Sequence, residues 1–398
     1  MKIAVTGMGI ISCAGNTVEE FWRSVITGRT GLGALTRFNH PKIVTTTVGE
    51  VQNFELNEQF NSRTRTRTDR HIQYALSAAD QAVVQSGLNF AQMDPYRIST
   101  VIGTCSGSYD YINHAVDNLD QNKPVTPGFL TGSLNNMISA YINMHWGILG
   151  SGLAINGACA SGSQAIVVGA MLIETGQAEV VLVGGSENWI HPIPIGGLES
   201  LRALTYDTSG CRPFDRYRSG FSLSEGAAVL VLESADHAWR RDADVLAWLS
   251  GYGISSDADH PTAPRADGKS TTHMIKQAMY RAKIAKNQID YINAHATGTM
   301  IGDKIESEIL FNIFGDQPYL SSTKGITGHA IGAVGAMEAI IAIKTLDEQI
   351  IPATFNLSTP DCPGKHVINQ AITAPVTNVL SNNFGFGGTN SALIFSKV

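Results

Sequence analysis

The sequence is poor in cysteine and has no closely spaced cysteine pair. Its 398 residues include five cysteines, an odd number, and no two of them stand in a CxxC arrangement. Disulfide frameworks and zinc sites are usually built from cysteines in even numbers or in close pairs. We therefore expect reduced thiols, with neither a disulfide framework nor a metal site. The five are Cys13, Cys105, Cys159, Cys211 and Cys362.

Long hydrophobic runs and an excess of positive charge are also missing. The apolar run at residues 165–173 ends at Glu174, far short of the roughly 20 apolar residues that a membrane span needs. The first residues, MKIAVTG, already read as a strand and a turn, with no cleavable signal before them. Nucleic-acid binding requires a basic surface, whereas the net charge is −6. We expect a soluble, cytoplasmic protein that binds neither membranes nor nucleic acids.

Apolar residues and glycine, by contrast, are abundant. Hydrophobic residues make up 43% of the chain against 16% charged residues, enough for a large core, and 40 glycines indicate many tight turns. Runs rich in Ile and Val alternate with amphipathic stretches, which is typical of α/β proteins. We expect strands at residues 2–6, 99–104, 180–184, 227–233, 291–294 and 378–382. We expect helices at residues 69–86, 162–176, 270–285 and 333–347.

The sequence also contains a faint internal repeat. Residues 72–103 and residues 272–294 both read as a helix, a short polar loop and a strand, and each is followed later by a helix of small residues. The repeat favours two related halves, residues 1–250 and 251–398, packed face to face as one rigid unit. Chance similarity between two helix–strand units is the alternative.

One cysteine stands in an unusual setting. The segment NGACASGS at residues 156–163 places Cys159 among glycines and alanines, directly before a predicted helix. Small neighbours allow the backbone to turn sharply, and the dipole and free N–H groups of a helix start favour a thiolate. The same N–H groups can hold the oxyanion of a thioester under attack. Cys159 is therefore a candidate nucleophile, and a buried structural cysteine is the alternative.

A second polar segment, HATGT, begins at His295 after a predicted strand. Ligands usually bind at the carboxyl ends of strands in α/β sheets, so His295 is a candidate site residue. Thr297 and Thr299 could hydrogen-bond a substrate arm. Asp303 and Glu306 are three residues apart and could face the same side of a helix start, where we expect them to cap and anchor the turn.

Two glycine-rich segments complete the candidates. SSTKGITGHAIG contains Lys324 and His329, but it lacks the GxxxxGK[ST] order of a phosphate loop, and a lone histidine there would more often be structural. NFGFGGTN, at residues 383–390, surrounds Phe386 with flexible residues, which permits a mobile aromatic ring. A glycine-rich turn between two C-terminal strands is the alternative for this segment.

Taken in order, these segments resemble the β-ketoacyl synthase family of elongating condensing enzymes over nearly the whole chain. The resemblance begins with VTGMG at residues 5–9, continues through RPFD at residues 212–215 and SEGA at residues 224–227, and ends with GFGGTN. It implies a thiolase-like fold, in which two duplicated halves form a five-layered αβαβα sandwich, and a homodimer. A heterodimer with a related ketosynthase-like subunit is the alternative.

The resemblance also implies a catalytic set. Cys159 would carry an acyl chain as a thioester, and His295 and His329 would hold the enolate oxygen formed when a malonyl thioester loses carbon dioxide. Lys324 would orient the two histidines and bias their protonation. No cofactor or metal is implied. The remaining implied roles are an oxyanion hole of the Cys159 and Phe386 N–H groups, a gate at Phe386, pantetheine contacts at Thr297 and Thr299, and structural support from Asp303, Glu306 and Glu338.

An acyl carrier protein is the partner that the resemblance implies, because it would deliver the thioester. Carrier proteins are acidic, so a basic docking patch is required despite the net charge of −6. The segment RTRTRTDR supplies one, and an ordinary solvated stretch before a helix is the alternative. Its arginines are Arg63, Arg65, Arg67 and Arg70.

Several positions depart from the family's pattern, and one of them is the N-terminal turn at residues 12–15, where a proline is common. Ala296 stands where the family usually has glycine after the first catalytic histidine, and its methyl group could crowd the pantetheine tunnel. Cys105 and Ser106 fall in the strand-end region that helps to wall the acyl pocket, so the choice of acyl chain could differ from that of housekeeping fatty-acid enzymes. These departures favour a type II polyketide or polyene pathway over fatty-acid elongation.

Two further roles are compatible with the same resemblance. One is a condensing enzyme that also cyclises its product. The second is a non-catalytic chain-length factor, a partner subunit that typically lacks the nucleophilic cysteine. This chain has a cysteine at position 159, which argues against the second role.

Overall fold

The strands of the chain form two half-sheets that meet edge to edge. The computed structural model describes residues 2–60 and 62–398, without the side chains of Ser62 and Arg63. The first half-sheet has the strand order β1 (Ile3–Ser12), β7 (Gly226–Ser234), β6 (Val180–Glu187), β4 (Ile98–Gly103), β5 (Gly152–Ile155). The second has the order β8 (Ala247–Ser256), β15 (Thr389–Ser396), β14 (Asn378–Gly385), β9 (Tyr291–Asn293), β10 (Tyr319–Ser321), β12 (Lys365–His366). The two join where β1 pairs with β8 at three positions, from Ile3↔Leu249 to Val5↔Ala247.

Strand directions repeat from one half-sheet to the other. In the first, β1–β7 and β7–β6 are antiparallel, and β6–β4 and β4–β5 are parallel. In the second, β8–β15 and β15–β14 are antiparallel, and β14–β9 and β9–β10 are parallel. The same order of directions supports the duplication that the sequence predicts. The predicted boundary at residue 250 falls within β8, and its position stays a prediction.

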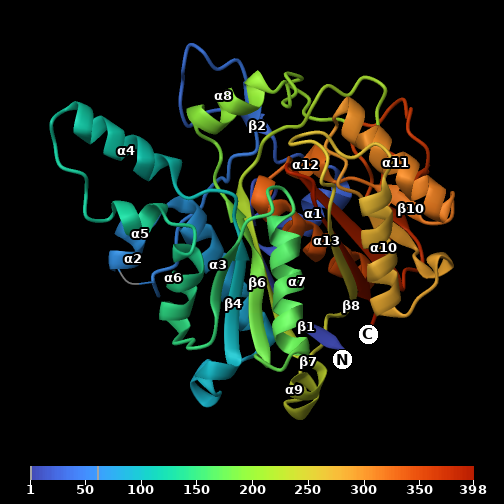
Figure 1. Cartoon of the computed structure of the whole chain (residues 1–398), viewed down its shortest axis with the longest axis horizontal. Helices are drawn as coiled ribbons and strands as arrows, with labels where there is room; N and C mark the ends of the chain where they lie inside the picture. Colours follow the sequence, from blue (N-terminus) through green and yellow to red (C-terminus); the bar gives the residue numbers. More distant parts are fainter. Residues whose placement is uncertain (1, 61) are drawn as a thin grey trace.

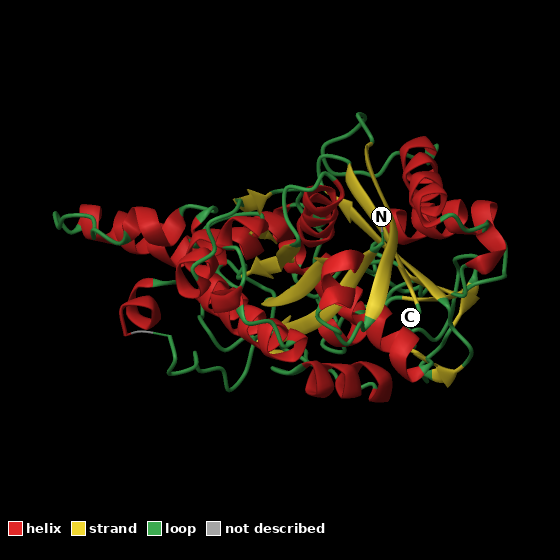
Figure 2. Ribbon diagram, turned by 90° about the horizontal axis from the view of Figure 1, so that it is seen from below, coloured by secondary structure: helices red, strands yellow, loops and turns green. Residues whose placement is uncertain are grey.

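Helices lie on both outer faces and between the half-sheets (Figures 1 and 2). Helices α3 (Arg70–Ser86) and α6 (Met137–Trp146) cover the outer face of the first half-sheet. Helix α10 (Lys269–Ala282), with α11 (Met300–Phe314) beside it, covers that of the second. Helices α7 (Ser161–Glu174) and α13 (Val334–Glu348) pack against each other and against strands of both halves. The architecture is therefore the five-layered αβαβα sandwich that was predicted.

The two central helices approach closely because their contact face is built from small residues. A Cβ atom on Gly162 would lie 2.9 Å from the carbonyl oxygen of Gly332 and 3.0 Å from the backbone nitrogen of Ala336. Any side chain at position 162 would therefore push α7 away from α13. Helix α13 is buried over nearly its whole length, as expected for a helix with apolar neighbours on every side.

Shorter elements connect these layers. The other helices are α1 (Val18–Thr27), α2 (Ser62–Arg67), α4 (Tyr109–Asp120), α5 (Phe129–Ser133), α8 (Pro192–Ser200), α9 (Ala235–Arg240) and α12 (Lys324–Thr327). The 3-10 turns are η1 (Phe90–Gln92), η2 (Pro95–Arg97), η3 (Lys286–Gln288) and η4 (Ile331–Ala333). Two small ribbons pair β2 (Gly33–Ala34) with β3 (Thr47–Val48) and β11 (Ile350–Ile351) with β13 (Ile372–Thr373). Figure 1 shows α4 and α5 reaching out from the body beside α6.

No helix in the described part of the chain is long and apolar enough to cross a lipid bilayer. Within the same residues, no group of three or more His, Cys, Asp or Glu side chains is arranged to hold a metal ion.

Candidate active site

A cavity of about 640 Å³ opens where strands of both halves end. The first half contributes Cys159, from the turn that leads into α7. The second contributes His295, which follows β9, His329, which follows α12, and Phe386, from the turn between β14 and β15. All four of these residues line the one cavity, so the fold brings together segments that lie far apart in the sequence.

The turn that carries Cys159 is sharp. Ala158 has a φ of 50°, in the left-handed region, and the amide of Ala160 donates a hydrogen bond back to the carbonyl of Gly157 (3.0 Å). The Ser161 hydroxyl accepts a hydrogen bond from the Gly157 amide (2.9 Å). A residue in this backbone region is strained and is often found beside a reactive group. The turn presents the sulfur to the cavity while only 8% of the residue is exposed.

Burial keeps the thiol of Cys159 protonated. It raises the pKa to about 12, although the charge of Lys324 and the backbone N–H groups of Phe386 and of Cys159 itself act in the opposite direction. Helix α7 begins at Ser161, two residues beyond Cys159. The sequence-based expectation of a thiolate at a helix start is therefore wrong for the resting site. The two N–H groups beside the sulfur could nevertheless serve as the donors of an oxyanion hole.

The two histidines face each other at the cavity. Their ring centroids are 5.3 Å apart and the ring planes meet at 83°. Burial lowers the pKa of both well below the usual value, and the nearby charge of Lys324 lowers it further. Both are therefore neutral at pH 7, when an imidazole has one nitrogen that donates and one that accepts. Within the described residues, the buried Nδ1 atoms of both rings have no hydrogen-bond partner.

Lys324 stands behind the histidines and does not line the cavity. It is completely buried, and its ammonium group is paired with Glu338 on α13. The Asn383 amide donates to the other oxygen of that carboxylate (2.6 Å). Asn383 lies on β14, so this buried ion pair joins the central helix to the second half-sheet. The positive charge of Lys324 contributes to the lowered pKa of the two imidazoles.

Two carboxylates on α11 hold the turn that follows His295. Glu306 accepts hydrogen bonds from the amides of His295 (2.9 Å) and Ala296 (2.7 Å). Asp303 accepts from the amides of Gly298 (3.0 Å) and Phe214 (2.8 Å). Burial raises the pKa of Glu306 to about 8 and that of Asp303 to about 6. Both side chains accept hydrogen bonds from backbone amides, and these bonds hold the turn in place.

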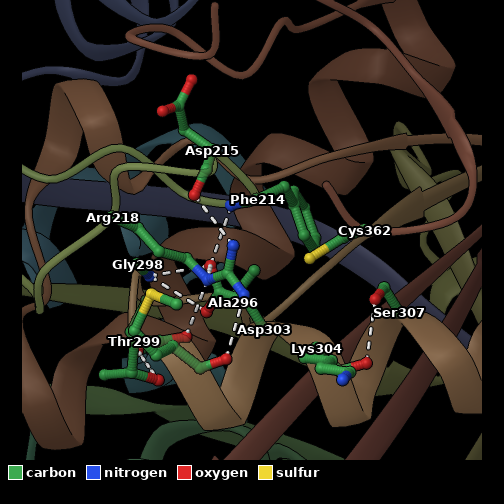
Figure 3. A network of polar contacts seen from close by, with 12 residues as sticks. Phe214, Asp215, Arg218, Ala296, Gly298, Thr299, Asp303, Lys304, Ser307 and Cys362 are labelled. Atoms are coloured by element: carbon green, nitrogen blue, oxygen red, sulfur yellow. Dashed lines mark hydrogen bonds and ion pairs between the residues drawn. The ribbon is translucent and has the colours of Figure 1, made fainter. Parts of the chain in front are cut away.

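Arg218 also binds the turn that follows His295, through the carbonyl groups of that turn (Figure 3). Its guanidinium donates to the carbonyls of Thr299 (3.1 Å) and Met300 (2.9 Å) and lies 3.9 Å from the Asp303 carboxylate. It also pairs with Asp361. Thr297 and Thr299, which both line the cavity, are thus held by a network around a buried arginine.

The methyl group of Ala296 belongs to the hydrophobic cluster that includes Phe214, Ile292 and Leu310. Ala296 also borders the cavity. The methyl group therefore packs beside His295 at the edge of the cavity, and its effect on a pantetheine arm stays a prediction.

The glycine-rich turn at Phe386 is tied to two other segments. The Thr389 hydroxyl donates to the carbonyl of Gly157 (2.7 Å), next to the nucleophile turn. The Asn390 amide donates to the buried carboxylate of Asp257 (2.7 Å). Phe386 itself remains 39% exposed, and the two glycines after it have φ of 83° and 70°. The ring is therefore partly exposed, hydrogen bonds hold the end of its turn that leads into β15, and the mobility of the ring stays a prediction.

The predicted docking arginines lie elsewhere. Arg65 and Arg67 lie on α2, and Arg70 is the first residue of α3; all three are exposed, and none of them lines the cavity. The side chain of Arg63 lies outside the described residues.

Several residues of the site were not found from the sequence. Asp257, Arg218 and Trp189 act through contacts with segments more than 15 residues away, and no local pattern marks them. Arg218 lies shortly after the RPFD motif at residues 212–215, and this motif is the signal that could have identified it.

Comparison with known proteins points to one family. The family model described as Beta-ketoacyl synthase, N-terminal domain, matches residues 1–238, and the corresponding C-terminal domain matches residues 246–358. The 3-oxoacyl-[acyl-carrier-protein] synthase 2 of Coxiella burnetii (strain RSA 493 / Nine Mile phase I) is 35% identical over 408 residues, which cover 100% of this chain and 99% of that protein.

Solved structures agree. The ishigamide ketosynthase/chain length factor superimposes with a TM-score of 0.94 at 32% identity, covering 100% of this chain and 99% of that one. AntDE:AntF, a type II PKS acyl-carrier protein in complex with its ketosynthase bound to the hexaketide, gives a TM-score of 0.90 at 26% identity, with 100% and 99% covered.

The chain therefore belongs to the β-ketoacyl synthase family of acyl-transferring condensing enzymes, and its fold is thiolase-like.

Proposed function

We propose that the chain is a β-ketoacyl-[acyl carrier protein] synthase that condenses a malonyl thioester with an acyl chain held on Cys159. One observation carries the proposal: Cys159 and two neutral imidazoles, His295 and His329, open on one cavity, with a buried lysine behind them. The pathway is a type II polyketide, polyene or fatty-acid pathway. The reaction uses no cofactor, because every group it needs is a thiol, an imidazole or a backbone N–H.

The first step transfers the acyl chain to Cys159. The sulfur attacks the carbonyl of the acyl thioester, and the thiol proton is accepted by a neutral imidazole, since the pKa of Cys159 is about 12. The oxyanion is held by the N–H groups of Cys159 and Phe386; such donors are worth about 3–4 kcal/mol each. The carbon–sulfur bond to the carrier breaks, and the proton passes to the departing pantetheine thiol.

The second step forms the carbon–carbon bond. The malonyl carboxylate leaves as carbon dioxide, and the negative charge that develops on the thioester oxygen is held by N–H groups of His295 and His329. The enolate carbon attacks the acyl group, the bond to Cys159 breaks and frees the sulfur as a thiolate, and the thiolate takes up one proton from solvent water. Burial and Lys324 hold both rings neutral, so that each presents one N–H to the enolate oxygen.

The substrate carrier is an acyl carrier protein whose pantetheine arm passes Thr297 and Thr299. The relatives support this: the Coxiella burnetii protein is named for an acyl carrier protein, and AntDE:AntF contains one. The exposed arginines Arg65, Arg67 and Arg70, together with Arg63, would form the docking patch.

The chain would work as a dimer, with a second copy or with a related ketosynthase-like subunit, as the name of the ishigamide ketosynthase/chain length factor suggests for that protein. We place it, with its carrier protein, in the cytoplasm. A purely non-catalytic chain-length-factor role is disfavoured because Cys159, His295, Lys324 and His329 are all retained.

The test is intact-mass analysis of the purified protein after incubation with acyl carrier thioesters. We expect the mass to rise by one acyl group, and the Cys159→Ala variant to stay unloaded. Cys362→Ala, which removes a thiol outside the cavity, is the control and should load normally. Absence of loading on the unchanged protein, with every carrier offered, contradicts the catalytic role and favours the non-catalytic alternative.

A further inference from the structure

The cavity has an open rim and a closed inner part. The rim residues Leu201, Met300 and Ile301 are 54%, 52% and 61% exposed. The inner wall consists of buried side chains of one hydrophobic cluster, including Leu198, Phe221 and Ile331. Under the proposed function, a pantetheine arm enters at the rim and reaches Cys159, so the acyl chain must extend beyond the sulfur toward the inner wall.

Trp189 is a partly buried side chain that borders this inner wall. It follows β6 by two residues, lines the cavity and packs against the same hydrophobic cluster. Its indole Nε1 donates a hydrogen bond to the Ser106 hydroxyl (2.8 Å). The ring of Tyr109 meets it edge-on, with centroids 6.2 Å apart, and itself stacks on His191 at 5.7 Å. The indole is therefore fixed by a hydrogen bond and by aromatic packing.

Its position is also fixed relative to the nucleophile. Ser106 and Cys105 are consecutive, and the Cys105 sulfur donates to the carbonyl of Ala158 (3.1 Å), the residue before Cys159. The Asn156 amide donates to the carbonyl of Cys105 (2.8 Å). One short segment thus bonds to the nucleophile turn on one side and to the indole on the other.

We propose that Trp189, held by Ser106, limits the length of the acyl chain that Cys159 carries. The inference rests on the proposed function and names the residue that selects its substrate. A rigid apolar wall discriminates by excluding methylene groups, and each group that it cannot accommodate lowers reactivity by about 10- to 200-fold. A fixed indole gives a sharp limit, whereas a mobile side chain would give a gradual one.

The test measures acyl loading on Cys159 by intact mass, with carrier thioesters that lengthen by two carbons at a time. For the unchanged protein we expect loading to fall at least about tenfold at one length. In Trp189→Ala this limit moves to chains longer by two carbons or more. In Ser106→Ala, which frees the indole, the limit becomes gradual. Trp239→Ala, which removes an exposed tryptophan on α9, is the control and keeps the original limit.

A length profile of Trp189→Ala identical to that of the unchanged protein overturns the inference while leaving the proposed function in place. Failure of the unchanged protein to load any chain is a failure of the proposed function instead. Thermal unfolding confirms that each variant is folded. If Trp189→Ala does not fold, Trp189→Phe decides the matter: it keeps a smaller ring without the donor, and an unmoved, sharp limit there also overturns the inference.

Discussion

Burial keeps the thiol and the two imidazoles of this site uncharged over a wider pH range than in water. Cys159 is buried and rests as a thiol, and the histidines beside it rest as neutral rings. A low-dielectric site disfavours the charged form of each group. Behind these groups, Lys324 is buried in an ion pair with Glu338. Under the proposed function, Cys159 would therefore be activated by proton transfer during the reaction and not by a permanent thiolate.

The state of Cys159 can be read from its reaction with iodoacetamide. Below the pKa of a thiol, the thiolate fraction rises about tenfold for each pH unit. With a pKa of about 12, alkylation of Cys159 should accelerate continuously from pH 7 to pH 10. A small free thiol, as reference, levels off above about pH 8.5. Mass spectrometry of the Cys159 peptide gives the rate, and a plateau below pH 8 would show that the resting site holds a thiolate.

The buried ion pair makes a second prediction at this scale. Lys324→Met leaves the Glu338 carboxylate buried without its partner, which costs about 3–5 kcal/mol in the free energy of unfolding. Replacing both partners, in Lys324→Met with Glu338→Leu, should restore most of that stability, since a matched apolar pair is often neutral.

Condensing activity should not return with the stability. The double variant lacks the positive charge that lowers the pKa of His295 and His329. Denaturant unfolding and a condensation assay together check this. Recovery of full activity in the double variant would mean that Lys324 serves stability alone.

At the scale of elements, a cluster at the base of the first half-sheet ties three of them together. Glu233 on β7 accepts a hydrogen bond from the Thr6 hydroxyl on β1 (2.5 Å) and contacts His237 on α9 (2.5 Å). Arg241 donates to it as well (2.9 Å). Burial raises the pKa of this carboxyl, but hydrogen bonds from Arg241, His237 and Thr6 outweigh that effect and lower it to about 2.

The cluster predicts a loss of stability in acid. The folded pKa of Glu233 lies below the unfolded value, so its contribution is complete above about pH 4.5 and disappears as the pH falls toward 2. A shift of this size corresponds to about 3 kcal/mol. Denaturant unfolding from pH 6 to pH 2 should show this fall, and Glu233→Gln should be less stable at pH 6 with a shallower fall. Equal slopes for both proteins would contradict the assignment.

Ten elements were predicted from their apolar patterns, and others, among them α1, α11, β8 and β15, were missed. The predicted helices 69–86, 162–176, 270–285 and 333–347 correspond to α3, α7, α10 and α13, and the six predicted strands to β1, β4, β6, β7, β9 and β14. Strand β8 was missed because it contains Gly251 and Gly253. A Cβ atom at either would lie 2.1 Å from a carbonyl oxygen of α10. Direct contact with a helix, which a single sequence does not reveal, decides the composition of that strand.

At the scale of the whole molecule, the arginines of the predicted patch lie outside the cavity, and we propose that they bind the carrier protein. Carrier docking by an acidic partner depends on charge and should weaken with salt. Arg65→Glu with Arg67→Glu should raise the apparent KM for a carrier-bound substrate about tenfold or more, by analogy with rim charges at other interfaces, and leave a small thioester mimic unaffected.

A matched control reverses the same number of charges in the second half of the chain. Lys286, before β9, and Lys397, after β15, are both exposed, and Lys286→Glu with Lys397→Glu should leave both KM values unchanged. Steady-state kinetics with both substrates gives the comparison. An equal loss on carrier substrate and mimic in the arginine variant would refute a docking role.

In the candidate site, too, some residues could be predicted from sequence motifs, whereas the contacts between distant segments could not. Cys159, His295, His329 and Phe386 were predicted because the segments that contain them, taken in order, resemble those of one family, and the four residues line one cavity. The pairing of Lys324 with Glu338 and the support of Trp189 by Ser106 depend on segments brought together only by folding. The protonation of the nucleophile depends on burial as well, and for that reason the helix start alone predicted the opposite charge state.

The contact between α7 and α13 has a consequence for how the chain could be divided. Cys159 lies before α7 in the first half, and His329 lies before α13 in the second half. Neither half alone therefore contains both the thiol and the imidazoles of the site. A cut in the connection at residues 241–246 would leave each fragment with a whole half-sheet. Each fragment would be inert when alone. Turnover would return only after mixing, so product formation would itself report that the fragments had reassembled.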